Sequence, residues 1–90
     1  MIERKIRVVN KLGLHARASS KLAATAGKFS SSIKLGKQGQ HFVDAKSIMA
    51  LMLLAAGIGS ELDLEVDGDD EQSAADEIEE LFASYFGEGE

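Results

Sequence analysis

Apolar and polar residues follow two different periods along the chain, and each period predicts one kind of element. Alternation of apolar and polar residues predicts four strands, at residues 6–9, 33–35, 42–43 and 62–66. Apolar or small residues spaced three or four apart predict three helices, at residues 16–26, 48–54 and 71–86. The predicted element order is therefore β-α-β-β-α-β-α.

Turn and capping residues predict where these elements end. Gly27 is expected to end the first helix in a left-handed conformation, and Ser47 to cap the start of the second. The second helix is expected to close at Gly57 or Gly59. The glycine-containing segment 36–39 is typical of the connection in a β-hairpin.

Helices on one side of a mainly antiparallel sheet satisfy this order, because the strands alternate and the helices are amphipathic. The last helix is expected to bury one stripe, formed by Ala74, Ile78, Leu81, Phe82 and Tyr85. The predicted fold class is α+β: a two-layer open-faced β-sandwich whose four-stranded sheet carries three helices on one face. No Pro or low-complexity linker divides the chain, so we expect a single domain over residues 1–90.

The composition excludes several classes of function. The chain has no Cys, which removes disulfides, thiolate metal sites and thiol chemistry. Its longest apolar run, 48–56, is much shorter than the ~20 residues of a membrane helix, so we expect no membrane insertion. The N-terminus alternates charged with apolar residues and lacks a signal-peptide core, which predicts a cytoplasmic protein.

Charge divides the chain into two halves. Residues 1–50 carry ten basic and two acidic side chains, whereas residues 51–90 carry thirteen acidic and no basic ones. We expect a basic docking face for acidic partner surfaces beside two helix N-termini, formed by Lys11, Arg17, Lys21 and Lys46. The acidic last helix should then face away and favour solubility.

His15 is the most informative residue because it stands immediately before the first helix. The free backbone N–H groups of Ala16 and Arg17 make an anion site there, and the helix dipole reinforces it. The dipole also favours the neutral imidazole that a phosphoryl-accepting nucleophile requires. A metal ligand is a poor alternative, since His41 is the only other His, and a general base for hydrolysis lacks a nucleophile beside it. A surface His that merely caps the helix is an alternative of equal weight.

Arg17 lies in the first helical turn, where a cation is unfavourable unless an anion visits the site. The planar fork of donors on its side chain suits phosphate, and it can also pair with carboxylates on a partner. A solvated surface Arg is the alternative. Together with His15, Arg17 therefore favours an anion site.

Ser47 is a good N-cap by itself, which is a sufficient structural explanation. A phosphate attached there would be accommodated by the helix N-terminus and would obstruct an acidic partner. The segment that follows is apolar around its whole circumference, so some of its side chains should stay exposed as a docking surface. The candidates are Ile48, Met49, Leu51 and Met52, and complete burial in the core is the alternative.

Two motifs carry a resemblance to a known family. Gly13-Leu14-His15-Ala16-Arg17, followed about thirty residues later by Lys46-Ser47-Ile48-Met49, closely resembles HPr, the histidine-containing phosphocarrier of the bacterial phosphoenolpyruvate-dependent phosphotransferase system. The likeness extends over nearly the whole chain, including the acidic turn at 67–71 and the last helix. The open-faced β-sandwich of that family agrees with the predicted element order.

The resemblance implies that His15 accepts a phosphoryl group on Nδ1 from enzyme I and passes it to a IIA domain, with no cofactor and no metal. Arg17 would then steady the phosphoryl group and contact both partners. Ser47 matches the regulatory serine of members that have an HPr kinase/phosphorylase. The partner-facing positions of the family are matched by Ser20, Lys21, Ile48, Met49 and Met52. The chain would be a phosphorylated carrier rather than an enzyme, and we expect a monomer.

The sequence departs from the commonest family pattern at one point, because Ala18-Ser19 stands where Pro-Ala usually follows the Arg. Pro would preset the first helical turn, so the departure concerns the stiffness of the loop and not the phosphoacceptor. The entry at 10–13 and the ending at 81–86 also resemble NPr, the nitrogen-branch relative. The sugar-transport and nitrogen branches therefore both stay open.

Two functions from other classes are the alternatives. One is a regulatory binding module in which His15 only caps a helix and phosphorylation of Ser47 selects partners. The other is nucleic-acid binding through the basic first half of the chain. That half lacks an aromatic stacking surface and an Arg-rich run, so we expect no nucleic-acid partner.

Overall fold

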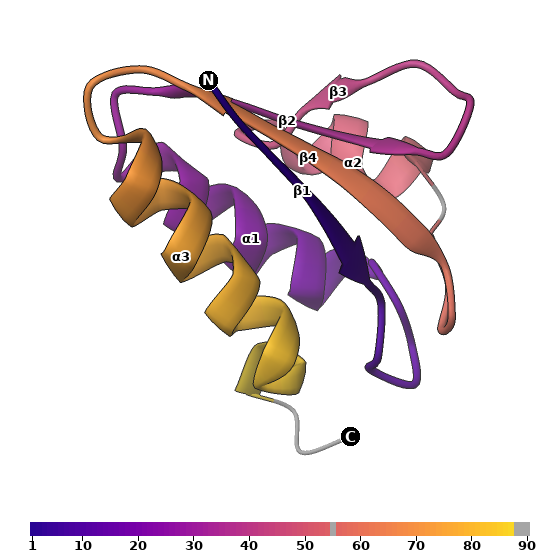
Figure 1. Ribbon diagram of the computed structural model, residues 1–90. Coiled ribbons are helices and arrows are strands. Elements are labelled where there is room, and N and C mark those ends of the chain that lie inside the picture. The colour runs from indigo at the N-terminus through magenta and orange to yellow at the C-terminus, as the bar shows by residue number, and fades with distance from the viewer. Residues whose placement is uncertain (55, 88–90) are drawn as a thin grey trace.

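The computed structural model describes residues 1–54 and 56–87, and this part of the chain forms one four-stranded sheet (Figure 1). The strands are β1 (Ile2–Arg7), β2 (Ser32–Lys37), β3 (Val43–Asp44) and β4 (Glu61–Asp67). Their order in the sheet is β1-β4-β2-β3, and every neighbouring pair is antiparallel. The inner strand β4 therefore pairs with the first strand of the chain on one side and with the hairpin on the other.

Three α-helices lie on one face of the sheet: α1 (Ala16–Gly27), α2 (Ile48–Leu54) and α3 (Glu71–Ala83) (Figure 1). Helix α1 packs against both other helices, while α3 also contacts β1 and β4, and α2 contacts β3. This arrangement confirms the predicted α+β open-faced sandwich, its element order and its three helices on one face. None of the described helices is long and apolar enough to cross a membrane.

The alternating pattern of β4 sets the register of the whole sheet. Leu62, Leu64 and Val66 are buried beneath the helices, and the acidic residues between them point to the open face. Ile6 of β1 lies opposite Leu62, and Leu35 of β2 lies opposite Leu64. A shift of one residue would turn the acids of β4 into the core, so the register is strongly specified.

The structure corrects several predicted element ends. Gly27 is the last residue of α1 and is not left-handed, because the helix closes through a tightened turn in which Lys28 N donates to Thr25 O at 3.2 Å. Helix α2 ends at Leu54, so its predicted closure at Gly57 or Gly59 is wrong. Gly59 does have a left-handed φ of 86°, but its N–H donates to Val8 O and leads the chain into β4.

Two strand boundaries also differ from the prediction. The first strand begins and ends earlier, at Ile2–Arg7 instead of 6–9, because its alternating charged residues face solvent and pair across to β4. The hairpin of β2 and β3 is confirmed, but Gly36 lies inside β2 and the connection spans 38–42. Phe42 packs over Gly36, where an added Cβ would lie 3.2 Å from Phe42 Cγ.

The last helix is shorter than predicted, and Tyr85 lies outside its buried stripe. Helix α3 ends at Ala83, and a 3₁₀ turn, η1 (Tyr85–Gly87), follows it. Tyr85 and Phe86 both have positive φ angles, of 60° and 54°. This turn buries Phe86 in place of Tyr85, and the Phe86 and Phe82 rings pack edge to face with centroids 4.8 Å apart.

Ion pairs on the open face of the sheet join the basic first half of the chain to the acidic second half. Lys5 Nζ lies 3.4 Å from Asp63 Oδ1, and Arg7 Nη2 lies 3.0 Å from Glu61 Oε1. Each pair links β1 to β4 at directly opposed positions of the ladder. Two of the ten basic residues are thus used inside the fold and do not contribute to a separate docking face.

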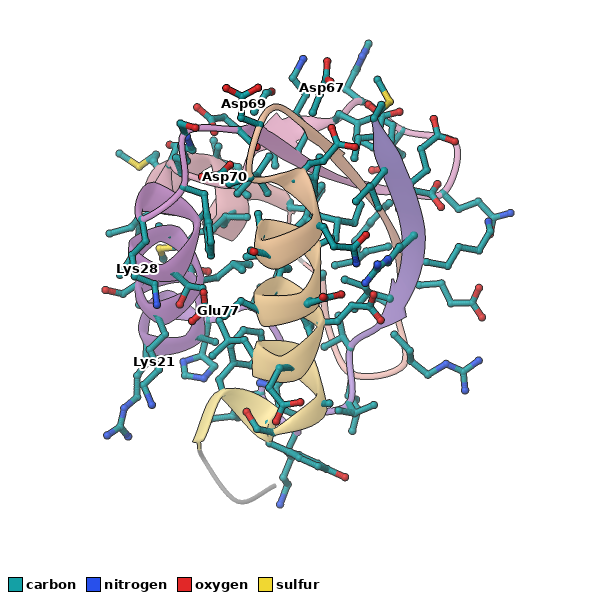
Figure 2. The ribbon with its side chains drawn as sticks, turned by 60° about the vertical axis from the view of Figure 1, so that its left-hand side comes forward. Lys21, Lys28, Asp67, Asp69, Asp70 and Glu77 are labelled. Atoms are coloured by element: carbon teal, nitrogen blue, oxygen red, sulfur yellow. The ribbon has the colours of Figure 1, made fainter. Side chains whose placement is uncertain are left out.

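Helix α3 is tied to the rest of the molecule by the same kind of contact. Arg4 of β1 donates to Asp76 and Glu79. Lys28, the C-cap residue of α1, lies on the side of Glu77 (Figure 2), with 2.8 Å between Nζ and Oε1. The hydrogen bond from Arg4 is the main reason that the pKa of Asp76 is lowered. The acids of α3, expected to favour solubility, therefore also hold β1 and the C-terminal end of α1 in place.

Candidate functional site

The loop that leads into α1 is fixed by a side-chain hydrogen bond within the loop and by a backbone hydrogen bond to the segment after α2. Asn10 Nδ2 donates to Gly13 O at 2.8 Å, and Leu14 N donates to Ala56 O at 2.9 Å. Gly13 has a left-handed φ of 64°, and an added Cβ would collide with the Ala56 carbonyl. The Gly of the first motif is thus required both by its conformation and by this close approach.

His15 is the N-cap of α1, as the capping interpretation predicted. Its backbone is extended, with φ −75° and ψ 179°, and Arg17 N donates to His15 Nδ1 at 3.3 Å. Nδ1 therefore faces the helix N-terminus with its lone pair and carries no proton in this arrangement. A group bonded to Nδ1 would lie at the positive end of the helix dipole.

The first turn of α1 supplies the N–H donors expected there. The first backbone bond of the helix is Ser19 N to His15 O at 2.8 Å, so the N–H groups of Ala16, Arg17 and Ala18 precede the regular ladder. Ala16 and Arg17 are exposed, whereas the Ala18 side chain is buried. The Arg17 side chain makes no ion pair or hydrogen bond with the part of the chain that the structure describes, so its guanidinium is available to an anion or a partner.

Ser19 contributes to the site, and sequence reasoning missed its role. Its hydroxyl is buried and donates to Leu14 O at 3.0 Å. This bond ties the residue before His15 to the first turn of α1, so the loop is held although Ala18 replaces the usual Pro. The Ala18-Ser19 pair predicted a change in the stiffness of the loop. The sequence alone did not show that the Ser19 hydroxyl would form a hydrogen bond that restrains this loop.

The remaining predicted basic residues differ in their availability. Lys21 Nζ donates to Phe86 O at 2.7 Å and Lys46 Nζ to Phe29 O at 2.8 Å, so both hold distant backbone segments. Lys11 is exposed, as is Ser20 on α1. The predicted basic face is therefore carried mainly by Arg17 and Lys11, with Lys21 and Lys46 partly engaged within the fold.

Ser47 caps α2 as predicted, because Ala50 N donates to Ser47 Oγ at 3.2 Å. Helix α2 packs against α1, so the structure brings the Ser47 helix beside the His15 helix. Ile48, Met49 and Met52 are exposed, whereas Leu51 is buried in the core. The interpretation that part of this helix stays exposed is confirmed, and complete burial is excluded.

Three further apolar residues, on α2 and on the loops before α1 and after α2, are also exposed, and sequence reasoning did not single them out. They are Leu12, Leu53 and Ile58. Leu12 and Ile58 adjoin the contact between Gly13 and the segment after α2, and Leu53 follows Met52 on α2. Their apolar character was visible in the sequence, but their exposure depends on how the two loops pack.

A metal centre is not indicated at this site. Among residues 1–54 and 56–87, no group of three or more His, Asp or Glu side chains is placed to hold a metal ion.

The acidic residues Asp67, Asp69 and Asp70 lie together at the turn before α3 (Figure 2). Asp70 bonds Ser30 and Ser31, just beyond the C-terminal end of α1, so this turn lies at the opposite end of α1 from His15.

Comparison with known families decides the identity of this arrangement. Residues 2–84 match the family model described as "PTS HPr component phosphorylation site". The chain belongs to the HPr family. It is 57% identical to the phosphocarrier protein HPr of Cupriavidus necator over 90 residues, which cover all of both chains.

Solved structures agree with this assignment. An HPr structure from Thermoanaerobacter tengcongensis superposes with a TM-score of 0.92 at 43% identity and covers 98% of each chain. Crh, the catabolite repression HPr of Bacillus subtilis, superposes with a TM-score of 0.67 at 40% identity and covers 99% of this chain and 97% of its own. The protein is thus an HPr phosphocarrier of the phosphotransferase system, a carrier that acts with partners of that system and is not an enzyme.

Proposed function

We propose that His15 Nδ1 is the atom that carries the phosphoryl group, from phosphorylated enzyme I to IIA domains. The observation that supports this most directly is the hydrogen bond from Arg17 N to Nδ1, which aims the nitrogen lone pair at a helix N-terminus. Nδ1 attacks phosphorus, an N–P bond forms, and the bond between phosphorus and the donor breaks. The incoming phosphoryl group replaces the imidazole nitrogen as acceptor of the Arg17 N–H.

The surrounding groups stabilise this intermediate without enclosing it. Ala16 and Arg17 offer backbone N–H groups, and the Arg17 guanidinium offers a fork of donors to phosphate or to partner carboxylates. The site is open to solvent, since both residues are exposed, so one surface can serve donor and acceptor in turn. Ser20, Lys21, Ile48, Met49 and Met52 complete this proposed docking surface.

The test is phosphorylation by enzyme I, phosphoenolpyruvate and magnesium. The wild type should gain one acid-labile phosphoryl group, and His15→Ala should gain none, because the substitution removes the imidazole that is proposed to carry the group. His41→Ala is the matched control, since His41 lies on the hairpin connection, and it should be phosphorylated at the wild-type rate. Acid-labile labelling of His15→Ala would contradict the proposal.

The position of Ser47 at the start of α2, beside α1, supports a second, regulatory role. A phosphate on Ser47 would place almost two negative charges beside the exposed side chains of α2 and oppose an acidic partner. Where the cell has an HPr kinase/phosphorylase, Ser47 is its proposed target. Whether this carrier serves sugar uptake or the nitrogen branch follows from which IIA proteins accept its phosphoryl group.

Ser47→Asp is expected to slow phosphorylation of His15 by enzyme I at least tenfold while the protein stays folded. The added carboxylate repels an acidic partner and weakens its docking on α2, and together these effects should cost more than about 1.4 kcal/mol of binding free energy. Initial rates with purified enzyme I measure the effect. Ser73→Asp on α3 is the control, since it adds the same charge at an exposed position on another helix. Equal rates for all three proteins would remove the regulatory role.

The proposed relay acts as a monomer, because one chain supplies His15, the hydrogen-bond donors to the phosphoryl group and the docking residues. Its proposed compartment is the cytoplasm. Crh forms a dimer by swapping, so the oligomeric state is checked directly by sedimentation at the protein concentrations of the phosphorylation assay.

A further inference from the structure

The open face of the sheet carries a concavity that the proposed relay does not use. It has a volume of about 400 Å³, and its lining includes Glu3 and Lys5 of β1, Asp63 and Glu65 of β4, and Phe42 of the hairpin connection. The three described α-helices lie on the other face of the sheet (Figure 1). The sheet therefore separates this concavity from the helices.

Two carboxylates of the concavity lack a cation. Glu3 and Glu65 lie directly opposite each other in the ladder of β1 and β4. Neither side chain makes an ion pair or hydrogen bond with the part of the chain that the structure describes. The neighbouring pair, Lys5 and Asp63, differs because its ammonium and carboxylate lie 3.4 Å apart. Like charges at directly opposed positions destabilise a sheet, so a cation between Glu3 and Glu65 would relieve a repulsion that the fold leaves in place.

Two further cations lie near these carboxylates and do not neutralise them. Arg4 also lines the concavity, but its guanidinium donates to Asp76 and Glu79 of α3. Lys34 of β2 lies opposite Glu65 in the ladder, yet its ammonium forms no ion pair with any described residue. The charge of the concavity therefore favours a ligand that brings its own cation.

Phe42 gives the concavity an aromatic surface. Its side chain is 38% exposed and packs over Gly36, which lies opposite Asp63 in the ladder of β2 and β4. The ring and the carboxylates therefore border the same concavity. The face of an aromatic ring attracts a cation, and a planar guanidinium can also stack on it.

These features together select one kind of ligand. A guanidinium offers a fork of donors to carboxylates and a planar surface to an aromatic ring, whereas an ammonium offers only a point charge. Ligands that carry phosphate, including nucleic acids and anionic lipids, would be repelled by the carboxylates. Free arginine has a carboxylate of its own, which the concavity would also repel, but in a polypeptide that group is an uncharged amide.

We propose that the open face of the sheet binds an arginine side chain of a basic polypeptide segment, with the guanidinium between Glu3 and Glu65 and beside Phe42. This inference goes beyond the proposed function and does not rest on it. Because the helices occupy the other face, the basic segment and a phosphoryl-exchange partner can bind the protein at the same time. The protein then has a second contact surface that takes a basic ligand, whereas Arg17 takes acidic groups.

The test follows the amide chemical shifts of the isotopically labelled protein during titration at low salt. The probe is an N-acetylated, C-amidated peptide with two arginines in a Gly-Ser background, and matched peptides carry lysine or glutamate in place of arginine. The arginine peptide should shift the amides of Glu3, Phe42 and Glu65, and the lysine peptide should bind about threefold more weakly. The glutamate peptide and free arginine should leave these amides unchanged. Binding of the arginine peptide should weaken as salt rises.

Substitutions in the concavity assign the contact to its residues. Glu65→Gln should weaken binding of the arginine peptide about threefold, and Glu3→Gln combined with Glu65→Gln about tenfold, as expected for exposed ion pairs. Phe42→Leu keeps an apolar side chain over Gly36 and should weaken binding about threefold through loss of the ring. Glu80→Gln, which removes the same charge at an exposed position on α3, should bind the peptide as the wild type does.

Several outcomes would overturn the inference. One is that the amides of the concavity do not shift, or that the largest shifts fall on the acidic turn at 67–71 or on α1 and α2. Another is that Glu65→Gln and Glu80→Gln bind the peptide equally, which would make the contact nonspecific. A third is that free arginine or the glutamate peptide shifts the same amides as strongly. Saturating arginine peptide should leave the KM for phosphorylation by enzyme I unchanged, and a raised KM would overturn simultaneous binding.

Discussion

At the residue level, His15 depends on neighbours that position its backbone. The side chains of Asn10 and Ser19 each donate a hydrogen bond to a backbone carbonyl of the loop before α1. Gly13 allows this loop to approach Ala56 closely. The backbone N–H of Arg17 donates to Nδ1 of the imidazole and so sets its direction. The precision of the site therefore comes from a rigid loop and a helix end.

Ser19→Ala should destabilise the protein by about 1 kcal/mol, because the buried hydroxyl bond to Leu14 O is lost. Urea unfolding measures the change. The matched control is Ser20→Ala, an exposed neighbour on the same helix, which should change stability by less than about 0.5 kcal/mol. Adding Ala18→Pro to Ser19→Ala restores the usual family pair and should recover about 0.4–1 kcal/mol. Equal stability of the Ser19 and Ser20 variants would exclude the proposed loop restraint.

The site residues were predictable from sequence to the extent that their roles are local. Caps are local, so His15 and Ser47 could be assigned from the residues that follow them. Lys21 could not, because its partner is the carbonyl of Phe86, 65 residues away. Tyr85 was placed in the wrong environment for a related reason: the helical period does not show where two positive φ angles interrupt it.

At the level of elements, one carboxylate joins three segments at the end of the molecule opposite His15. Asp70 precedes α3 and accepts hydrogen bonds from the backbone N–H and hydroxyl groups of Ser30 and Ser31. The Ser31 hydroxyl, followed by the Ser30 backbone N–H, lowers the pKa of Asp70 to about 2. Asp70 is the N-cap residue of α3 but makes no side-chain cap bond, and its carboxylate instead fixes the link from α1 to β2.

Asp70 therefore predicts how stability depends on pH. Its folded-state pKa, about 2, lies below the ordinary 3.8, so its contribution is complete above the ordinary value and is lost as pH falls through about 2. Asp70→Asn should be less stable than wild type at neutral pH, and the difference should narrow on acidification. Urea midpoints from pH 6 to pH 2 measure this, and a constant difference would contradict it. The exposed neighbour Asp69→Asn should follow the wild-type curve.

The sheet was the most predictable element because its alternation is explicit in β4. Leu62, Leu64 and Val66 are separated by acids, and this pattern alone places them on the buried face. The ends of α1 and α2 were less predictable, since Gly27 and Gly59 have the same side chain but different φ angles. Glycine permits a left-handed conformation without requiring one, and the surrounding chain decides.

At the level of the whole molecule, several basic residues of the first half of the chain form ion pairs with acidic residues of the second half. Arg4, Lys5, Arg7 and Lys28 all pair with acids from the second half. The net charge of −5 therefore describes the surface poorly, because Lys11 and Arg17 stay exposed on the loop and first turn that flank His15, while the acidic turn lies at the other end of α1. The sequence predicted the basic face but not how many of its cations the fold would use.

This distribution predicts the salt dependence of the relay. The apparent kcat/KM for phosphorylation by enzyme I should fall roughly tenfold between about 0.05 and 0.5 M salt, because screening weakens the steering of acidic partners toward Arg17. Arg17→Gln should lower the rate at low salt and flatten the dependence. Glu80→Gln, which changes the net charge by one unit in the opposite direction at an exposed position on α3, should keep the wild-type slope. A salt-independent wild-type rate would contradict charge steering.

The place of β4 between β1 and β2 also governs how the molecule is assembled during synthesis. β1 leaves the ribosome before the other three strands of the sheet, and among the described residues it pairs with β4, which begins at Glu61. The cations of that strand find their carboxylate partners on the same late segment and on α3. Translation must therefore pass Asp67, about three quarters of the way along the chain, before the sheet can close, and the nascent protein carries a net positive charge until its acidic remainder emerges.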